Sequence, residues 1–235
     1  MTKLLASTIL GSIAALAMVA AGPLTAKPAA PAKSAAVAWD QKLSLSPEGN
    51  HVIGNPAAKA RLVEFMSYTC PHCAHFAEES RVALLPGLVR QGKVAIEVRP
   101  FFRNIIDVSA SLLALCGPES KFVGNHHAIL AAQPSWLKNP PEGAQERWNT
   151  PDFGARMKAV AKDMGLYGLM TARGYTPAQL DQCLANRPLA EKLAAQTNAA
   201  IEGGVNGTPG FLINGKLQEA HEWSALQPHL TAAAR

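Results

Sequence analysis

Two cysteines separated by two residues are the feature of this sequence most able to do chemistry. Cys70, Pro71, His72 and Cys73 follow an apolar segment and open a stretch with helical spacing. Two cysteines three apart on a first helical turn can close a disulfide within a small loop. The unpaired amides and the partial positive charge of a helix N-terminus favour a thiolate, which is the attacking species. We therefore predict a redox pair, with Cys70 accessible and Cys73 beneath the helix end.

The residues around the two cysteines suit this chemistry. His72 can favour a thiolate if it is protonated or donates a hydrogen bond, and Pro71 fits a first turn, where its missing amide hydrogen is no loss. Glu64 interrupts the apolar strand of residues 62–66, where a charge is unfavourable unless it has a use. A raised pKa would suit Glu64 to accept a proton from Cys73, although an outward-facing Glu64 is the alternative.

Cysteine pairs at this spacing also occur in zinc sites and in inert bridges. A structural zinc site needs four ligands, and Cys116 and Cys183 are not a second close pair. His72 and His75 could contribute, so metal binding stays open as an alternative. An inert bridge rarely spans three residues, because so short a loop is strained and reducible. We predict no resident metal or other cofactor.

The other two cysteines lie far apart in the sequence. Cys116 and Cys183 both fall in predicted helices, on apolar faces with Leu112 and with Leu180 and Leu184. We predict that they form a structural disulfide with each other. The alternative is two buried thiols that act as small hydrophobic side chains.

Two further pairs of residues could suggest a site, but packing explains them better. His126 and His127 are adjacent in a helical stretch, and adjacent side chains on a helix point apart, which disfavours a shared metal ion. Trp136 and Trp148 could line a substrate groove, yet both suit packing in a core or a loop.

A strand, a helix and a second strand must position the redox pair. The predicted segments are a strand at Ala60–Ser67, a helix from Cys70 to about Val89 and a strand at Lys93–Phe102. Apolar positions of the helix include Phe76 and Val82, and Pro86 should kink or end it.

A long helical region and a hairpin follow. Residues 104–203 have helical spacing, interrupted by a loop at 134–151, with capping hydroxyls before prolines at Thr150 and Thr176. Gln179 completes a capping box with Thr176. A hairpin turns at Asn214-Gly215, and a short helix begins near Trp223. This order predicts an α/β fold with an inserted α-helical domain.

The N-terminus has the composition of an export signal. Residues 1–26 begin with Lys3, continue through an apolar run and offer small residues for cleavage, as in a secretory signal peptide; a membrane anchor is the alternative. Residues 27–38 are rich in Pro and Ala and read as a disordered tether. The net charge is +5 without basic runs, which gives nucleic-acid binding little support. Cysteines in an exported chain can form disulfides.

Two segments resemble the DsbA-like proteins of the thioredoxin superfamily. The segment Val63–Cys73 (VEFMSYTCPHC) is similar to the active-site region of that family, and Gly204–Lys216 (GVNGTPGFLINGK) is similar to its C-terminal segment. The resemblance runs from roughly Gln41 to the C-terminus. It implies a thioredoxin-like domain at 39–103 and 204–235, with residues 104–203 as the helical insertion.

The resemblance also implies roles for individual residues. Cys70 is the attacking cysteine and Cys73 the resolving one, and Glu64 is the buried acid beneath the disulfide. Pro209 is a cis-proline opposite the disulfide, and the Thr208 backbone meets an extended substrate peptide.

The implied protein is a monomeric periplasmic oxidoreductase without a cofactor. It donates the disulfide of Cys70 and Cys73 to thiol-containing exported proteins, and a membrane DsbB-like oxidase reoxidises it. A lowered pKa of Cys70 would make it an oxidant. A reductase or isomerase of the same superfamily is the near alternative. A metal-binding protein, or a peptide-binding module with a vestigial active site, belongs to a different class.

Overall fold

The computed structural model of this protein describes residues 37–235. The predicted signal peptide, residues 1–26, lies outside the described residues, and so does the predicted tether, residues 27–38, apart from its last two positions. None of the described helices is long and apolar enough to cross a membrane.

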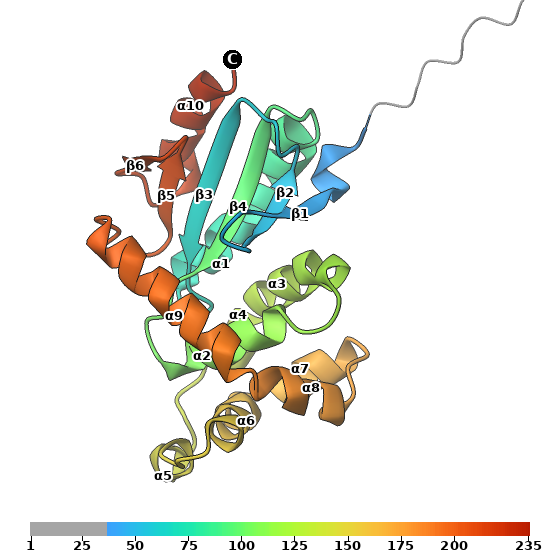
Figure 1. Ribbon diagram of the computed structural model, residues 1–235, viewed down its shortest axis with the longest axis vertical. Helices are drawn as coiled ribbons and strands as arrows, with labels where there is room; N and C mark the ends of the chain where they lie inside the picture. The colour runs from blue at the N-terminus through green and yellow to red at the C-terminus, as the bar shows by residue number, and fades with distance from the viewer. Residues whose placement is uncertain (1–36) are drawn as a thin grey trace, which may run out of the picture. The chain divides into compact units, whose positions relative to one another are not determined.

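A mixed sheet of six strands, in the order β1-β2-β4-β3-β5-β6, carries the site (Figure 1). β3 and β4 are parallel, and every other neighbouring pair is antiparallel. The strands are β1 (Leu43–Leu45), β2 (His51–Gly54), β3 (Ala60–Met66), β4 (Val94–Pro100), β5 (Gly210–Ile213) and β6 (Lys216–Gln218). A short 3₁₀ turn, η1 (Trp39–Gln41), precedes them.

The central strand β3 is covered on both of its faces. Side chains alternate between the faces of a strand. Leu62 and Met66 pack in the main core, whereas Val63 and Phe65 pack in a smaller cluster with Ala200 of α9. Figure 1 shows α9 and α1 on opposite sides of the sheet. Burial of both faces explains the nearly continuous apolar run of β3.

The helix that follows β3 changes its winding part of the way along. It begins as α1 (Pro71–Glu79) and continues as a π-helix, η2 (Ser80–Val89), that contains Pro86. The amide of Arg90 donates to the Leu85 carbonyl five residues earlier, over 2.9 Å. The helix therefore widens and continues through Pro86 instead of ending there. Val82 is 61% exposed, so its predicted core position is wrong; the buried residues of η2 are Ser80, Leu84 and Val89.

The chain between β4 and β5 is helical and contains no strand among its described residues. Its elements are α2 (Ile105–Ala114), η3 (Glu119–Lys121), α3 (Phe122–Ala131), α4 (Gln133–Trp136), α5 (Ala144–Trp148), α6 (Phe153–Asp163), α7 (Leu166–Ala172), α8 (Pro177–Leu184) and α9 (Arg187–Glu202). The loop predicted at 134–151 contains α5 and most of α4. Short helices of this kind lack the length that makes helical periodicity visible in a sequence.

One of the two predicted N-caps of this region is confirmed. Thr176 and Gln179 form the reciprocal capping box at the start of α8. The predicted cap at Thr150 is wrong. Asp152 caps α6, because its carboxylate lies closer to the helix and accepts the Ala155 amide over 2.6 Å.

A hairpin and a last helix complete the fold, as predicted. β5 and β6 are joined at Asn214 and Gly215, whose φ angles are 49° and 79°. An Asn-Gly pair suits this turn because both central residues need a positive φ. The helix α10 (Trp223–Ala233) then packs against β3 and β5. The predicted α/β fold with an inserted helical region is confirmed.

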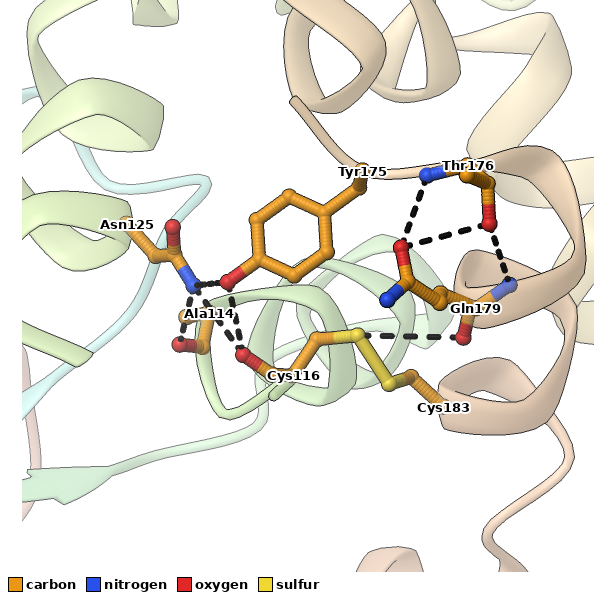
Figure 2. The surroundings of a disulfide bond; sticks show 7 residues. All are labelled: Ala114, Cys116, Asn125, Tyr175, Thr176, Gln179 and Cys183. Atoms are coloured by element: carbon orange, nitrogen blue, oxygen red, sulfur yellow. Dashed lines mark hydrogen bonds between the residues drawn. A yellow bond between two sulfur atoms is a disulfide. The ribbon is translucent and has the colours of Figure 1, made fainter. Parts of the chain in front are cut away.

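A disulfide joins Cys116, just after α2, to Cys183 of α8 (Figure 2). This is the pair that the sequence predicts to be linked. The Cys116 carbonyl accepts a hydrogen bond from the Tyr175 hydroxyl over 2.8 Å and another from the Asn125 amide over 3.3 Å. The covalent link thus lies within a network that ties α2, α3 and the start of α8 together.

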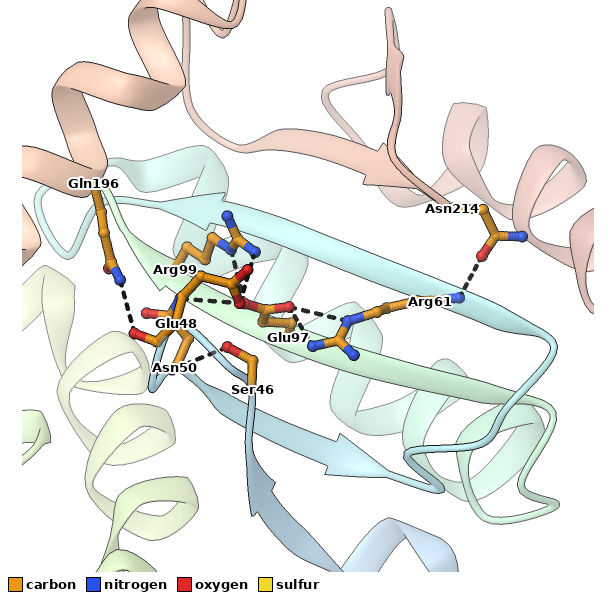
Figure 3. Close-up of polar contacts among 8 residues, drawn as sticks. All are labelled: Ser46, Glu48, Asn50, Arg61, Glu97, Arg99, Gln196 and Asn214. Carbon is orange, nitrogen blue, oxygen red and sulfur yellow. Dashed lines mark hydrogen bonds and ion pairs between the residues drawn. The ribbon is translucent and has the colours of Figure 1, made fainter.

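A buried carboxylate anchors the sheet face that lies opposite the main core (Figure 3). Glu97 of β4 is fully buried, and its Oε2 accepts two hydrogen bonds from Arg61 of β3, over 2.6 and 3.0 Å. Its Oε1 accepts from Arg99 over 2.8 Å and from Asn50 over 3.1 Å. Burial raises the pKa of Glu97, but the hydrogen bonds and charges of the two arginines outweigh burial and lower it.

Candidate active site

The redox pair lies where β3 passes into α1. Cys70 is the N-cap residue of α1, in an extended conformation, and Pro71 begins the helix. The Cys70 carbonyl accepts the amides of Cys73 and Ala74 over 3.1 and 3.2 Å, so the first turn closes on the cap residue. This placement brings the Cys70 side chain to the positive end of the helix, which favours a thiolate.

The sulfur of Cys70 faces the loop that precedes β5. The Thr208–Pro209 peptide bond is cis, and the Cys70 Sγ lies 3.1 Å from the Thr208 carbonyl oxygen. Two segments that lie 138 residues apart in the sequence therefore meet at one sulfur atom. Cys70 is only 3% exposed, so the predicted accessibility of this cysteine is wrong. The loop that presents Thr208 provides part of this cover.

The environment of Cys70 stabilises its thiolate. The pKa of Cys70 is lowered to about 5, mainly by a hydrogen bond from the Cys73 thiol. The Thr208 side chain and the backbone amides of Cys73 and His72 lower the pKa further, while burial opposes them. At neutral pH Cys70 is therefore a thiolate, the nucleophilic form of the residue.

Cys73 has the opposite character. It is fully buried, and its sulfur accepts the Ser67 amide over 3.4 Å. Burial raises the pKa of Cys73 far above the value of free cysteine, and the contact with Cys70 and the charge of Glu64 add to this effect. One sulfur is thus ionised and the other holds its proton, which suits an attacking and a resolving cysteine.

Glu64 lies on the same face of β3 as Leu62 and Met66, which pack in the main core, and the outward-facing alternative is wrong. It is 3% exposed, and it is opposite Val98 of β4 and Phe211 of β5 in the sheet register. Its Oε1 has no hydrogen-bond partner among residues 37–235. Burial raises the pKa of Glu64 to about 8, so the carboxyl group is protonated at neutral pH. A neutral acid near Cys73 can exchange a proton with it.

Of the two residues between the cysteines, His72 affects the pKa of Cys70 through its backbone and not through its ring. Pro71 and His72 are exposed on the first turn of α1. The His72 contribution to the low pKa of Cys70 comes from its backbone N–H, and its ring makes no hydrogen bond to another described residue. His75 pairs with Glu79 over 3.3 Å at the surface. Within residues 37–235, no three His, Cys, Asp or Glu side chains group closely enough to hold a metal ion.

A buried aspartate that the sequence analysis missed fixes the segment before Cys70. Asp107 of α2 accepts the Ser67 hydroxyl over 2.8 Å and the amides of Thr69 and Arg103 over 2.9 Å each. Burial raises the pKa of Asp107, and these donors partly offset it. A charged residue within the apolar run Ile105–Ala114 was the available signal, the same signal that identified Glu64.

A buried glutamine links the helical insertion to the active-site turn. The Gln133 amide donates to the carbonyl of Tyr68 over 2.7 Å and to that of Cys70 over 3.0 Å. The Tyr68 hydroxyl lies 3.0 Å from His126 Nδ1. Nothing in the sequence around Gln133 predicted this contact, because it depends on how α4 packs.

The other candidate residues serve packing. His126 is buried and stacks near Phe122 of the same helix. Trp136 and Trp148 are both buried in the main core, where their indole N–H groups donate to the Ile129 carbonyl and to Asp163. None of these side chains contacts Cys70 or Cys73.

Comparisons with known proteins agree with this geometry. The family model described as Thioredoxin matches residues 46–232. A crystal structure of a protein-disulfide isomerase from Novosphingobium aromaticivorans is 46% identical, with a TM-score of 0.74, over 78% of this chain and 96% of that chain. The structure of alpha-DsbA1 from Wolbachia pipientis shares the fold at 17% identity, with a TM-score of 0.65, over 81% of this chain and 93% of that chain.

A curated relative completes the comparison. A Rickettsia typhi protein, provisionally named a protein-disulfide oxidoreductase, is 30% identical over 70% of this chain and 54% of its own length. The chain spans about half the length of the first curated relatives that it matches. The family match covers most of the chain and both halves of the site. The chain therefore belongs to the thioredoxin family.

Proposed function

We propose that this protein is a periplasmic thiol–disulfide oxidoreductase that donates a disulfide to exported proteins. The observation that carries the proposal is the pKa of Cys70, lowered to about 5 while that of Cys73 is raised, opposite the cis Thr208–Pro209 peptide. This asymmetry defines which sulfur attacks and which one resolves. The sequence pattern of residues 1–26, which is typical of an export signal, supports the periplasmic location.

The reaction is a dithiol–disulfide exchange in two steps. A substrate thiolate attacks Cys70 of the oxidised pair, which forms a mixed disulfide and releases Cys73 as a thiolate. Cys73 takes up a proton, and the protonated Glu64 is the donor that the site offers. A second substrate thiolate then attacks the substrate sulfur and releases Cys70 as a thiolate. The substrate loses two electrons, and the pair of Cys70 and Cys73 gains them.

The low pKa of Cys70 favours donation of the disulfide. A depressed pKa in the folded state stabilises the reduced protein above the pKa of unfolded cysteine, and this stability is lost as pH falls through about 5. At neutral pH much of this stabilisation of the reduced protein is present, so the oxidised protein readily gives its disulfide to a substrate.

Reoxidation requires a membrane partner of the DsbB kind. The chain acts as a monomer.

An extended peptide is the form of substrate that the site accommodates best. Thr208 faces Cys70 with its backbone carbonyl, and backbone groups recognise extended peptides without regard to their sequence. Thiol-bearing segments of newly exported, unfolded proteins fit this description. The covered sulfur of Cys70 then meets the substrate thiol beside the cis peptide.

Isomerase activity is the second candidate, because the relative that is 46% identical carries the name of a protein-disulfide isomerase. Two refolding assays separate the candidates: reduced ribonuclease tests disulfide donation, and scrambled ribonuclease tests isomerisation. We expect the oxidised protein to refold the reduced substrate, and the equilibrium with glutathione to give an oxidising potential. Activity only on the scrambled substrate would assign isomerase function, and a strongly reducing potential would overturn the proposed direction.

A further inference from the structure

The cis-proline loop has a side-chain anchor outside both motifs. His221 lies between β6 and α10, and its Nδ1 is 2.9 Å from the Pro209 carbonyl oxygen. A carbonyl can only accept a hydrogen bond, so Nδ1 carries the hydrogen in this contact. The imidazole therefore holds the carbonyl of the residue that follows Thr208.

The loop itself is closely packed and has little freedom of its own. A Cβ added to Gly210 would lie 2.7 Å from a methyl carbon of Val205 and 3.1 Å from the Gly207 carbonyl oxygen. A Cβ added to Gly207 would meet the His221 ring at 3.9 Å. Val205 thus closes the loop at Gly210, and His221 contacts it at Gly207 and Pro209. A pocket of about 320 Å³ lies beside the loop, with His221 in its wall.

The position of His221 is fixed by the core beneath it. Trp223, two residues later, is 9% exposed, and its ring lies edge-on to Phe76 of α1 at 6.4 Å. The ring centroids of Phe76 and of Phe211 in β5 lie 4.6 Å apart. The helix that Cys70 caps, the strand that follows the cis-proline loop and the segment that carries His221 therefore share one packing cluster.

We infer that His221 is a positioning residue for the reaction proposed above, on which this inference rests. Its imidazole holds the Pro209 carbonyl, and through it the Thr208 backbone, in the place where a substrate peptide meets Cys70. His221 does not contact the sulfur atoms, so its effect falls on how the peptide is held. Loss of the contact should raise KM more than it lowers kcat.

The first test uses the unaltered protein. A neutral histidine that donates from Nδ1 is the Nδ1-protonated tautomer, which ¹⁵N nuclear magnetic resonance distinguishes from the Nε2-protonated form. We expect neutral His221 to be the Nδ1-protonated tautomer. An Nε2-protonated tautomer would overturn the inference, whatever the activity of the protein.

The second test compares two nearly isosteric variants. His221→Asn keeps a donor nitrogen as many bonds from Cα as Nδ1, whereas His221→Leu has a similar shape and no donor. We expect kcat/KM for oxidation of a dithiol peptide to fall by about threefold to tenfold in H221L, mostly through KM, and to stay near wild type in H221N. His229→Ala, on the exposed face of α10, is the matched control and should keep wild-type kinetics.

The outcomes separate the two proposals. If wild-type protein fails to oxidise the peptide, the proposed function is wrong. If wild type is active and H221L and H221N behave alike, His221 has no positioning role. Urea denaturation of each variant checks that the fraction of folded protein is unchanged.

Discussion

Replacing Glu64 with glutamine should remove a decrease in the free energy of unfolding that becomes larger as pH rises. The pKa of Glu64 is raised from 4.5 to about 8 by burial alone. An acid with a raised folded pKa binds more protons when folded than when unfolded. Stability therefore falls as pH rises from 4.5 to about 8 and changes no further above that. By pH 7 the loss is about 3 kcal/mol, at roughly 1.4 kcal/mol per pH unit.

The assay is urea denaturation of the oxidised protein at several pH values between 4.5 and 8.5. The oxidised form is used because its disulfide removes the titration of Cys70 and Cys73. We expect the stability of Glu64→Gln minus that of wild type to increase by about 3 kcal/mol between pH 4.5 and pH 7 and then to level off near pH 8. Any constant cost of burying the amide shifts this difference without changing its slope.

A matched control and a clear refutation complete the design. Glu202→Gln, at the exposed end of α9, should leave the pH dependence of stability as it is in wild type. A difference between Glu64→Gln and wild type that stays flat from pH 4.5 to pH 8 would show that Glu64 is not a buried, neutral acid. The proposed proton exchange with Cys73 would then lose its donor.

Three further predictions follow from the site and its supports. The thiolate absorbance of the reduced protein should titrate with a midpoint near pH 5, and Cys70→Ser should abolish that step; a midpoint near 8.5 would contradict the pKa of Cys70. Glu97→Gln should destabilise the protein at pH 7 by about 2–4 kcal/mol by urea denaturation, because two arginines lose their counterion. The lowered pKa of Glu97 makes this loss shrink at acid pH, and an equal loss at pH 3 and pH 7 would contradict the ion-pair network. Replacing Cys116 and Cys183 with serine should reduce the free energy of unfolding by up to about 4 kcal/mol, less any strain, since the loop spans 67 residues. Free thiols located at Cys116 and Cys183 in non-reduced, alkylated wild-type protein would contradict the bridge.

The sequence was most informative where a residue broke a local pattern. Glu64 interrupts an apolar strand, and the structure gives it a buried position and a raised pKa. The Asn214-Gly215 turn and the capping box at Thr176 depend on neighbouring residues only, so both were predictable. The strands around the redox pair were also predictable, because their apolar runs reflect burial on both faces.

The sequence was least informative where packing between distant segments decides the structure. Val82 is 61% exposed, whereas Ser80, Leu84 and Val89 are the buried residues of η2, so the face of this helix that meets the core is set by packing. Gln133 reaches the Cys70 carbonyl from an element 63 residues away, and His221 reaches Pro209 across the end of the hairpin. Each of these contacts depends on tertiary arrangement, which no local pattern encodes.

The hydrogen bonds from Gln133 to the carbonyls of Tyr68 and Cys70 affect how the protein unfolds. The Tyr68 carbonyl is buried, and a buried acceptor that loses its donor is unfavourable by about 1–3 kcal/mol. Local opening of α4 therefore weakens the turn that carries the attacking cysteine, so the insertion and the redox turn belong to one cooperative folding unit. Grafting this redox motif onto a scaffold without the insertion would leave the Tyr68 carbonyl without its donor, while the Cys70 carbonyl would keep the amides of Cys73 and Ala74.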